Sequence, residues 1–327
     1  LIRSKLALNR SQLEIVQKYL LKAMELSNKY KIEKYLGNIY NLLGLYNHLN
    51  GNIPLAIEHF NNSIDFYDKV GDIVEAIKPI NNLGNIYYHI YGDKDRALNY
   101  FNRGYKISNK YGFVQGSIIF ANNIGEIYLN DLQYNKALPY FKEAIKTAEK
   151  TGDIRGYFIS NINLGYIYLH TDKYEKVYNI YLFLKIHFKQ NPVKDIEIEC
   201  SYYNFLGEFY GYLGKWKEGL DYSLKAKEGC KEYSIKEYFK AQAKVLCYRY
   251  FYEGYYNRDD VRGLIKLYDD IKINNYVLKT IFRFYNISIL EKDIEFANEL
   301  FNKFKDICHD LDSSMLNVFE KHMRLNL

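Results

Sequence analysis

The chain of 327 residues is 48% hydrophobic and 26% charged, so it carries enough apolar surface for a continuous core and lacks the composition of a disordered protein. Its formal net charge of +6 is small, and its lysines and arginines form no basic block, which argues against direct nucleic-acid binding. No apolar run reaches the roughly 18 residues of a membrane span, and no signal peptide is recognisable, so we expect a cytoplasmic protein without a membrane partner.

The first expected element is a helix over residues 12–30. Its last residues, Leu26–Tyr30 (LSNKY), are nearly identical to Ile107–Tyr111 (ISNKY), which end a helix in a later repeat. We therefore interpret residues 1–34 as a truncated first repeat in which mainly the second helix is present. Because the chain begins with Leu1 inside this repeat, we expect it to be a piece of a longer protein.

Regular helical repeats are expected over residues 35–190. Strings such as NLGNIY, NIGEIY and NLGYIY recur, and their glycines are separated by 40, 41, 40 and 42 residues. The five glycines are Gly44, Gly84, Gly125, Gly165 and Gly207. A small residue and then an aromatic residue follow the first three glycines, as Ala56 and Phe60, Ala97 and Phe101, and Ala137 and Phe141. Small residues let two helices approach closely and an aromatic ring fills the remaining gap, so the pattern predicts stacked helical hairpins.

Turn residues occur where such hairpins need them. Inside the pairs they are Asn50–Gly51, Gly92–Asp93 and Gly214, and between the pairs they are Gly71–Asp72, Gly112 and Gly152–Asp153. Glycine supplies the positive φ that tight turns require. The order helix, short turn, helix is therefore repeated along the chain.

The repeats become degenerate over residues 191–310. In the sixth repeat Gly219 takes the place of the small alanine and Ser223 that of the aromatic residue, so looser packing is expected. Residues 236–273 form a seventh repeat, and an eighth carries Ala297 and Phe301 but has Tyr285 where the glycine is expected. We predict a hinge at residues 189–195, next to Pro192, and a capping helix within residues 311–327 that covers the last apolar face.

Asparagines mark one face of the first helix in three consecutive repeats. Because residues at i, i+3 and i+7 share a helix face, the pattern forms three groups. The groups are Asn82 with Asn85 and His89, Asn123 with Glu126 and Asn130, and Asn163 with Tyr166 and His170. The opposite face is apolar, as in Leu83 with Tyr87. One interpretation is a binding surface, and the other is that asparagine is merely abundant on helices that face water.

The spaced glycines, small residues and aromatics resemble the tetratricopeptide repeat in its forty-residue variety. That variety occurs in kinesin light chains, in spindle-orientation adaptors and in bacterial peptide sensors of the Rap and PlcR type. The resemblance implies an all-α fold, a right-handed superhelical solenoid of tandem antiparallel helix pairs. It also implies that the first helices line a concave groove, in which amides at the positions of Asn82, Asn123 and Asn163 hold the backbone of a bound peptide.

Motifs of catalysis are missing from the sequence. It contains no Gly-rich phosphate loop, no HExxH and no GxSxG, and its seven histidines are isolated from one another. The four cysteines, Cys200, Cys230, Cys247 and Cys308, lie in apolar stretches without a paired spacing. The single tryptophan, Trp216, is interpreted as a packing residue. We therefore expect no enzyme, no cofactor and no bound metal.

Two functional hypotheses follow. The first is a cytoplasmic module that binds an extended peptide or partner segment in its groove and forms the sensing region of a larger bacterial regulatory protein. The alternative is a scaffold that assembles with itself or with a folded partner and recognises no short peptide. The sequence leaves open the bound partner, the missing domains, the oligomeric state and the regulated output.

Overall fold

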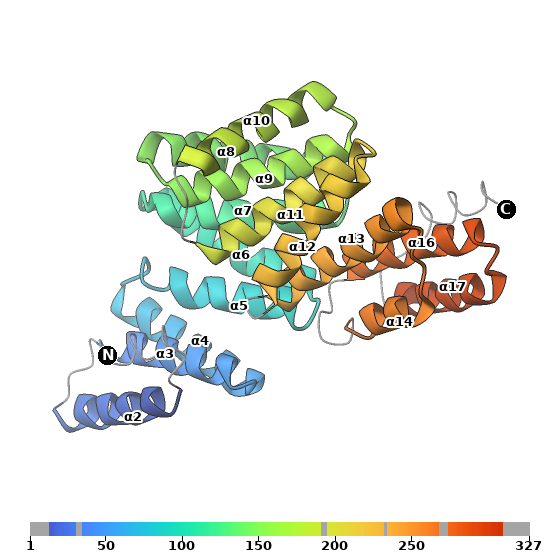
Figure 1. The fold of residues 1–327 in the computed structure, drawn as a ribbon. Coiled ribbons are helices and arrows are strands. Elements are labelled where there is room, and N and C mark those ends of the chain that lie inside the picture. Colours follow the sequence, from blue (N-terminus) through green and yellow to red (C-terminus); the bar gives the residue numbers. More distant parts are fainter. Residues whose placement is uncertain (1–12, 31–34, 191–194, 232–233, 268–273, 310–327) are drawn as a thin grey trace. The chain divides into compact units, whose positions relative to one another are not determined.

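The computed structural model describes residues 13–30, 35–190, 195–231, 234–267 and 274–309. These residues contain fifteen helices and no strand, which confirms the all-α prediction (Figure 1). They form two compact units. Unit 1 comprises residues 1–127 and 143–156, and unit 2 comprises residues 128–142 and 157–327. No helix in the described ranges is both long enough and apolar enough to cross a membrane.

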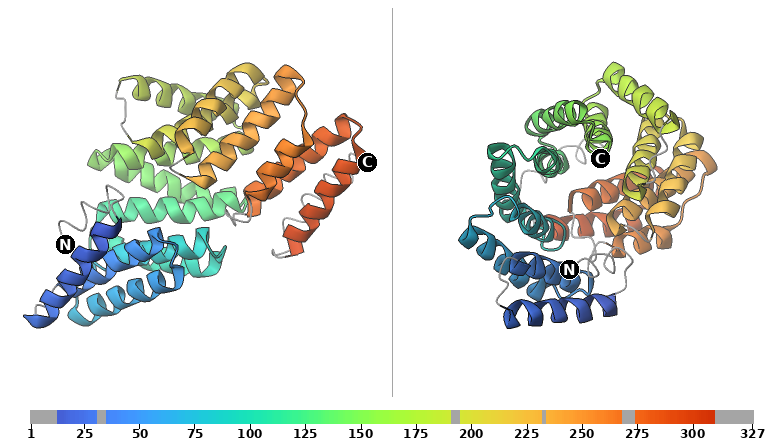
Figure 2. Two further views of the ribbon diagram at one scale, coloured as in Figure 1. Left: turned by 60° about the horizontal axis from the view of Figure 1, so that its bottom comes forward. Right: turned by 90° about the vertical axis from the view of Figure 1, so that its left-hand side faces the viewer.

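Unit 1 begins with a single helix and continues as helix pairs joined by short turns. Its helices are α2 (Leu13–Lys29), α3 (Leu36–Leu49), α4 (Ile53–Val70), α5 (Ile77–His89) and α6 (Lys94–Lys110). Two further helices, α7 (Val114–Asn130) and α8 (Tyr134–Thr151), are divided between the units. Helix α2 is the element expected over residues 12–30. Figure 2 shows α3 and α4 packed side by side as one pair.

The pairs of unit 1 pack through the predicted glycine and aromatic residues. A Cβ added at Gly44 would lie 2.5 Å from the ring of Phe60, and one at Gly84 would overlap the ring of Phe101. Both rings are almost completely buried, and so is Ala97. The aromatic residue of the second helix therefore lies on the glycine of the first helix within its own pair, which explains why this position accepts no larger residue.

Unit 2 continues the same arrangement. Its helices are α9 (Ile154–His170), of which the first three residues belong to unit 1, α10 (Tyr174–Gln190), α11 (Ile196–Tyr212), α12 (Trp216–Cys230), α13 (Ile235–Glu253), α14 (Arg258–Lys266), α16 (Asn274–Leu290) and α17 (Ile294–His309). A continuous core extends from α12 to α17, and α16 and α17 run side by side (Figures 1 and 2). Trp216 stacks on Phe251 with ring centroids 4.5 Å apart, in agreement with its interpretation as a packing residue.

The packing of unit 2 departs from the sequence pattern in its choice of aromatic residue. Gly165 is covered by Phe205 of the next first helix. At Gly207 the hydroxyl of the buried Ser223 lies where an aromatic ring covers the glycine in other pairs. The Ser223 Oγ donates to the carbonyl oxygen of Gly219 at 2.7 Å. Tyr248 of α13 lies beside Gly211 and Gly219, where an added Cβ would meet its ring.

Glycines with positive φ occupy the expected turns at residues 51, 71, 92, 112, 152 and 214, and Gly254 adds another. Three turns inside pairs use a residue with a side chain in this conformation, namely Leu132, Asp172 and Lys292. Two sequence predictions fall partly or wholly outside the described residues: the hinge at 189–195, of which residues 191–194 are not described, and the capping helix at 311–327. The change in repeat quality at residue 190 stays a prediction, and the two units divide elsewhere, within α7 and α8 and near the start of α9.

Candidate functional site

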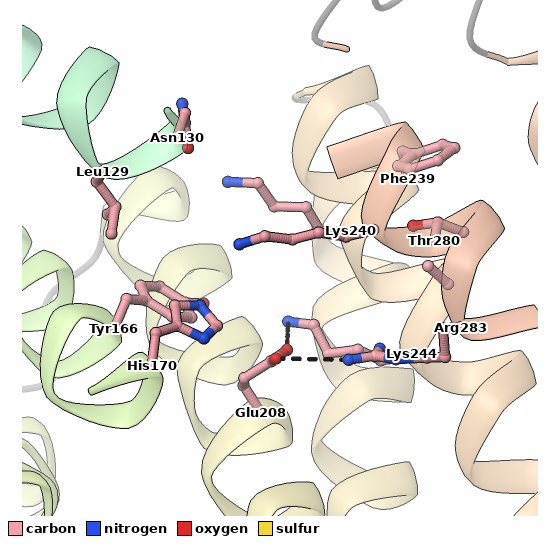
Figure 3. Close-up of a pocket in the computed structure, with 12 residues that line it drawn as sticks. Leu129, Asn130, Tyr166, His170, Glu208, Phe239, Lys240, Lys244, Thr280 and Arg283 are labelled. Atoms are coloured by element: carbon pink, nitrogen blue, oxygen red, sulfur yellow. Dashed lines mark ion pairs between the residues drawn. The ribbon is translucent and has the colours of Figure 1, made fainter. Parts of the chain in front are cut away.

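A pocket in unit 2 is lined only by first helices of successive pairs. Its walls come from the end of α7 and from α9, α11, α13 and α16, and no second helix contributes among the described residues. The lining residues are Leu129, Asn130, Tyr166, His170, Glu208, Phe239, Lys240, Ala243, Lys244, Lys279, Thr280 and Arg283. Four of them are cations and one is a carboxylate, so the pocket is strongly basic for its size (Figure 3).

Glu208 of α11 lies at the centre of this charge cluster. Its carboxylate oxygens are 3.6 Å from Nζ of Lys244 and 3.7 Å from Nη2 of Arg283, as the dashed lines in Figure 3 indicate. Burial raises the pKa of this carboxyl, but the two cations outweigh that effect and lower the pKa to about 2. Glu208 is therefore ionised throughout the physiological pH range.

Lys244 of α13 is held in place by hydrogen bonds to α11. Its side chain is 6% exposed, and its Nζ donates to the backbone oxygen of Asn204 at 2.8 Å and to Asn204 Oδ1 at 3.1 Å. Burial lowers the pKa of Lys244 to about 8, although the nearby Glu208 opposes the shift. The amide of Asn204 in turn donates to Glu237 Oε2 at 2.9 Å, so that acceptors and donors of this buried residue are both used.

The two remaining lysines differ in their partners. Lys240 pairs with Glu237 Oε1 at 2.7 Å, one turn away on α13. Lys279 of α16 is half-buried and forms no hydrogen bond or ion pair within the described part of the chain. Burial lowers the pKa of Lys279 to about 8. Four cations thus share two carboxylates, Glu208 and Glu237. Lys279 is the one cation of the four without a direct ion pair in the described part of the chain.

The facing wall is polar but carries no acid. Asn130 at the end of α7 is buried, and Tyr166 of α9 packs edge-on against Phe205 with centroids 5.6 Å apart. His170 is exposed to solvent at the mouth of the pocket and stacks on Tyr134. Desolvation and the nearby Lys279 lower the pKa of His170 to about 4 despite this exposure, because protein surrounds the ring on several sides. The imidazole is therefore neutral at pH 7.

Unit 1 uses its asparagines differently. Nδ2 of Asn82 donates to Oδ1 of Asn41 at 3.2 Å, and Nδ2 of Asn123 donates to Oδ1 of Asn81 at 2.8 Å. Each bond joins the first helices of two consecutive pairs. Each of these bonds uses one of the two N–H donors of the donating amide. The side chains of the two donors, Asn82 and Asn123, are half-buried. The amides therefore contribute to the stacking of repeats, a role that the sequence pattern did not suggest.

The nine candidate site residues divide between the two units. Asn130, Tyr166 and His170 line the pocket of unit 2. Asn163, which lies on α9 with Tyr166 and His170, is half-buried and is not among the residues that line the pocket. The other five belong to unit 1 and are Asn82, Asn85, His89, Asn123 and Glu126, all of them half-buried. Their role in binding stays a prediction.

The charged residues of the pocket were missed by the sequence analysis, although two signals exist. Glu208 directly follows the repeat glycine, as Asn85, Glu126 and Tyr166 do. The pairs Lys240 with Lys244 and Lys279 with Arg283 each have i, i+4 spacing and lie 39 residues apart, close to the repeat length. These cations form no basic block in the sequence because they are far apart along the chain, and the stacking of first helices brings them to one pocket.

The described residues contain no group of three or more His, Cys, Asp or Glu side chains that could hold a metal ion. The pocket presents groups that can bind a ligand. It offers ammonium and guanidinium groups on one side and amide and hydroxyl groups on the other, while Leu129 and Phe239 supply apolar surface. Such a combination of apolar walls and a few placed polar groups is typical of ligand sites.

Comparisons with known proteins identify the fold. No protein-family model matches the chain, and no curated protein does. Among solved structures, RapI in its apo form has a TM-score of 0.62 and 14% identity, with 84% of this chain and 97% of RapI covered. A Rap protein complexed with Competence and Sporulation Factor has a TM-score of 0.65 and 15% identity, with coverage of 85% and 76%.

A third similar structure is the Rap conjugation gene regulator of plasmid pLS20 in complex with the Phr* peptide. It has a TM-score of 0.60 and 14% identity, with 84% of this chain and 76% of the regulator covered. Identities this low establish a shared fold and no more. The chain is thus an all-α protein of tetratricopeptide-like helix pairs, similar in fold to the Rap proteins.

Proposed function

We propose that this chain is a polypeptide-binding module and that an extended segment of its ligand enters the pocket of unit 2. The observation that carries the proposal is the lining of this pocket: every wall residue comes from a first helix. Stacked first helices present side chains at regular intervals along one surface, as an extended peptide presents its own groups. A pocket formed in this way suits a chain better than it suits a compact small molecule.

The chemistry of the walls supports the same conclusion. A peptide backbone offers paired N–H and C=O groups whatever its sequence, and the carboxamide of Asn130 can match both. Lysine, arginine and the hydroxyls of Tyr166 and Thr280 can donate to ligand carbonyl oxygens. The apolar surface of Leu129 and Phe239 can accommodate a ligand side chain. These groups provide binding and orientation, and none of them forms a recognisable catalytic arrangement.

The proposal extends to a biological role. Two of the structures with the same fold are complexes, one of a Rap protein with Competence and Sporulation Factor and one of the pLS20 regulator with the Phr* peptide. By this analogy we assign the chain to the ligand-sensing region of a larger cytoplasmic bacterial regulatory protein. The identity of 14–15% makes the analogy one of fold, so the role depends on the binding experiment.

The experiment is an affinity selection with a synthetic pool of random peptides of about twelve residues, each with free termini, followed by calorimetric titration of the enriched peptides. We expect enriched peptides to bind wild-type chain and to bind the His170→Ala variant several-fold more weakly. The matched control is His187→Ala, which changes a half-buried histidine on the second helix α10 and should leave affinity unchanged.

Failure to enrich any peptide would contradict the proposal. So would enriched peptides that His170→Ala and His187→Ala affect equally, because the binding surface would then not be the pocket. Concentration-dependent self-association without peptide binding, measured by light scattering, would instead favour the alternative of a scaffold.

A further inference from the structure

We propose that the pocket of unit 2 recognises a carboxylate of the bound polypeptide, held by Lys279 and Arg283 of α16 together with Lys240 of α13. The inference rests on the proposed function and makes it more specific, because it names the chemical class of the ligand group. The carboxylate can be the C-terminal group of a peptide or the side chain of Asp or Glu.

The charge balance is the first argument. Glu208 is shared between Lys244 and Arg283, and Glu237 pairs with Lys240. No other carboxylate lines the pocket, since the remaining walls are amide, hydroxyl, imidazole and apolar groups. Lys279 is left without an ion-pair partner in the described part of the chain. One unpaired ammonium group matches the single negative charge of a carboxylate.

Burial makes this imbalance costly. An ammonium group that loses part of its water without gaining a direct ion pair is disfavoured, and the half-buried Lys279, which Glu208 affects only at longer range, is in this position. The lowered pKa of Lys279, about 8, agrees with that reading. A ligand carboxylate would replace the lost water with a charged hydrogen-bond acceptor, so binding would remove a cost that the unbound protein bears.

The distances within the cluster leave Arg283 available for a second partner. Its Nη2 is 3.7 Å from Glu208, beyond the length of a direct hydrogen bond, and its side chain is 38% exposed. A guanidinium group has five N–H donors in a planar fork that fits the two oxygens of a carboxylate. Lys240 extends into the pocket toward the wall that carries Asn130 (Figure 3), so cations lie on more than one side of the space.

Glu208 provides a sharp test because it distinguishes an acidic ligand group from a basic one. If the ligand group is a carboxylate, Glu208 repels it and competes for Arg283, and Glu208→Gln should strengthen binding. If the ligand group is basic, Glu208 is its counter-charge and the same change should weaken binding. Lys279→Gln should have the opposite effects: it should weaken binding of a ligand carboxylate and strengthen binding of a basic ligand group.

The probes are the peptides enriched in the affinity selection, in three forms. The first is the free acid, the second has a C-terminal amide, and the third has every Asp and Glu replaced by Asn and Gln. We expect at least one of the two neutralised forms to bind wild-type chain about tenfold more weakly, and the form that does so identifies the source of the carboxylate. For the acid form, Lys279→Gln should weaken binding about tenfold and Glu208→Gln should tighten it several-fold.

The control is Lys266→Gln, which removes an exposed lysine at the end of α14 in the same unit and should change nothing. Circular dichroism spectra and melting curves confirm that each variant folds. Enriched peptides that bind the pocket equally well in all three forms would overturn the inference and leave the proposed function intact. A failed selection would overturn both.

Discussion

Within each unit, hydrogen bonds between side chains join the first helices of consecutive pairs, and the donors of these bonds are neutral in unit 1 and charged in unit 2. In unit 1 the donors are neutral amides, Asn82 to Asn41 and Asn123 to Asn81, across 41 and 42 residues. In unit 2 the donor is the ammonium group of Lys244, which bonds Oδ1 of Asn204 across 40 residues. An amide bridge requires no counter-charge, whereas a buried ammonium does.

This difference explains why the charged pocket forms in unit 2. Placing Lys244 in a buried bridge requires a carboxylate nearby, and Glu208 supplies it at 3.6 Å. Arg283 then shares Glu208, and the cluster as a whole keeps an excess of positive charge. The comparison indicates that one repeat scaffold can carry either a neutral amide bridge or a charged cluster, depending on whether an asparagine or a lysine stands at a first-helix contact.

The largest expected effect is on the charge cluster of unit 2. The pKa of Glu208, about 2 against an ordinary 4.5, corresponds to roughly 3 kcal/mol of stability at neutral pH. We expect Glu208→Gln to lower the free energy of unfolding by about 2–3 kcal/mol at pH 7, as measured by chemical denaturation. Because the folded pKa is depressed, the difference from wild type should shrink as the pH falls from about 4.5 toward 2.

The control for this change is Glu228→Gln, which neutralises an exposed carboxylate on α12 and should alter stability little. An equal effect of the two variants would mean that Glu208 is an ordinary surface acid. We expect Glu208→Gln to show both effects, a lower free energy of unfolding and tighter binding of acid peptides.

Glycine packing should also differ between the units. A methyl group at Gly84 meets the buried ring of Phe101, which has no space to move, so Gly84→Ala should cost about 2 kcal/mol. At Gly207 the methyl group would lie 2.5 Å from the Ser223 hydroxyl and 3.4 Å or more from the backbone of Gly219 and Ser223, and Gly207→Ala should cost less because a hydroxyl is displaced and not a ring. Thermal unfolding of the two variants compares them directly. A larger loss for Gly207→Ala would contradict the packing described for α11 and α12.

Peptide binding to unit 2 should depend on pH in the alkaline range. Lys244 and Lys279 have pKa values of about 8, so their positive charge is lost as the pH rises from 7 to 9. Of the other groups facing them, Glu208, Arg283 and the neutral His170 keep their charge state over this range, and Lys240 has its counter-ion in Glu237. Affinity for an acid peptide should therefore fall about tenfold, as titrations at the two pH values would reveal. Constant affinity would contradict a role for these lysines.

A smaller effect is expected from the amide bridges of unit 1. Asn123→Ala removes the hydrogen bond to Asn81 and leaves its oxygen without that donor, which should cost about 1 kcal/mol of stability. Asn85→Ala, at a half-buried first-helix position with no recorded bridge, is the matched control. If Asn123→Ala weakens peptide binding without affecting stability, the asparagines act as a binding ladder, as the sequence analysis expected, and the bridge is unimportant.

The smallest expected effect concerns a turn. Lys292 is exposed and has a φ of 56°, a conformation that L-residues avoid and glycine adopts readily. Lys292→Gly should therefore raise the free energy of unfolding, by less than about 1 kcal/mol. Lys266→Gly is the control, because Lys266 lies in the last turn of a helix, where glycine should be destabilising. A loss of stability in Lys292→Gly would contradict a left-handed backbone conformation at this turn.

Much of the fold was predictable because its determinants are local and periodic. The repeat glycines, the buried alanines and the turn glycines each recur at fixed spacing, so one repeat is informative about the next. The turns at Leu132, Asp172 and Lys292 lacked this signal, since a residue with a side chain adopts the glycine conformation there. The position of Tyr248 beside Gly211 and Gly219 of the preceding pair was equally hidden, because it depends on packing between pairs.

The candidate site was predictable only in part. Asn130, Tyr166 and His170 were found because they continue the asparagine face of the first helices. Glu208 lies in the same register but was not predicted, because Phe205 and not an asparagine stands two residues before its repeat glycine. Lys244 and Arg283 escaped notice because degenerate repeats lack the glycine that would have aligned them with their neighbours. Whether a lysine is a solvated surface charge or a pocket residue depends on which helices stack beside it, and composition does not reveal this.

The most direct test of the account is hydrogen–deuterium exchange of the chain with and without an enriched acid peptide. The account predicts slower exchange in the first helices of unit 2, around residues 166–170 of α9, 204–210 of α11, 239–247 of α13 and 278–284 of α16. Second helices α10, α12, α14 and α17 should be unaffected, and Lys279→Gln should abolish the protection at the same peptide concentration. Protection confined to the second helices, or protection that Lys279→Gln leaves unchanged, would contradict the account.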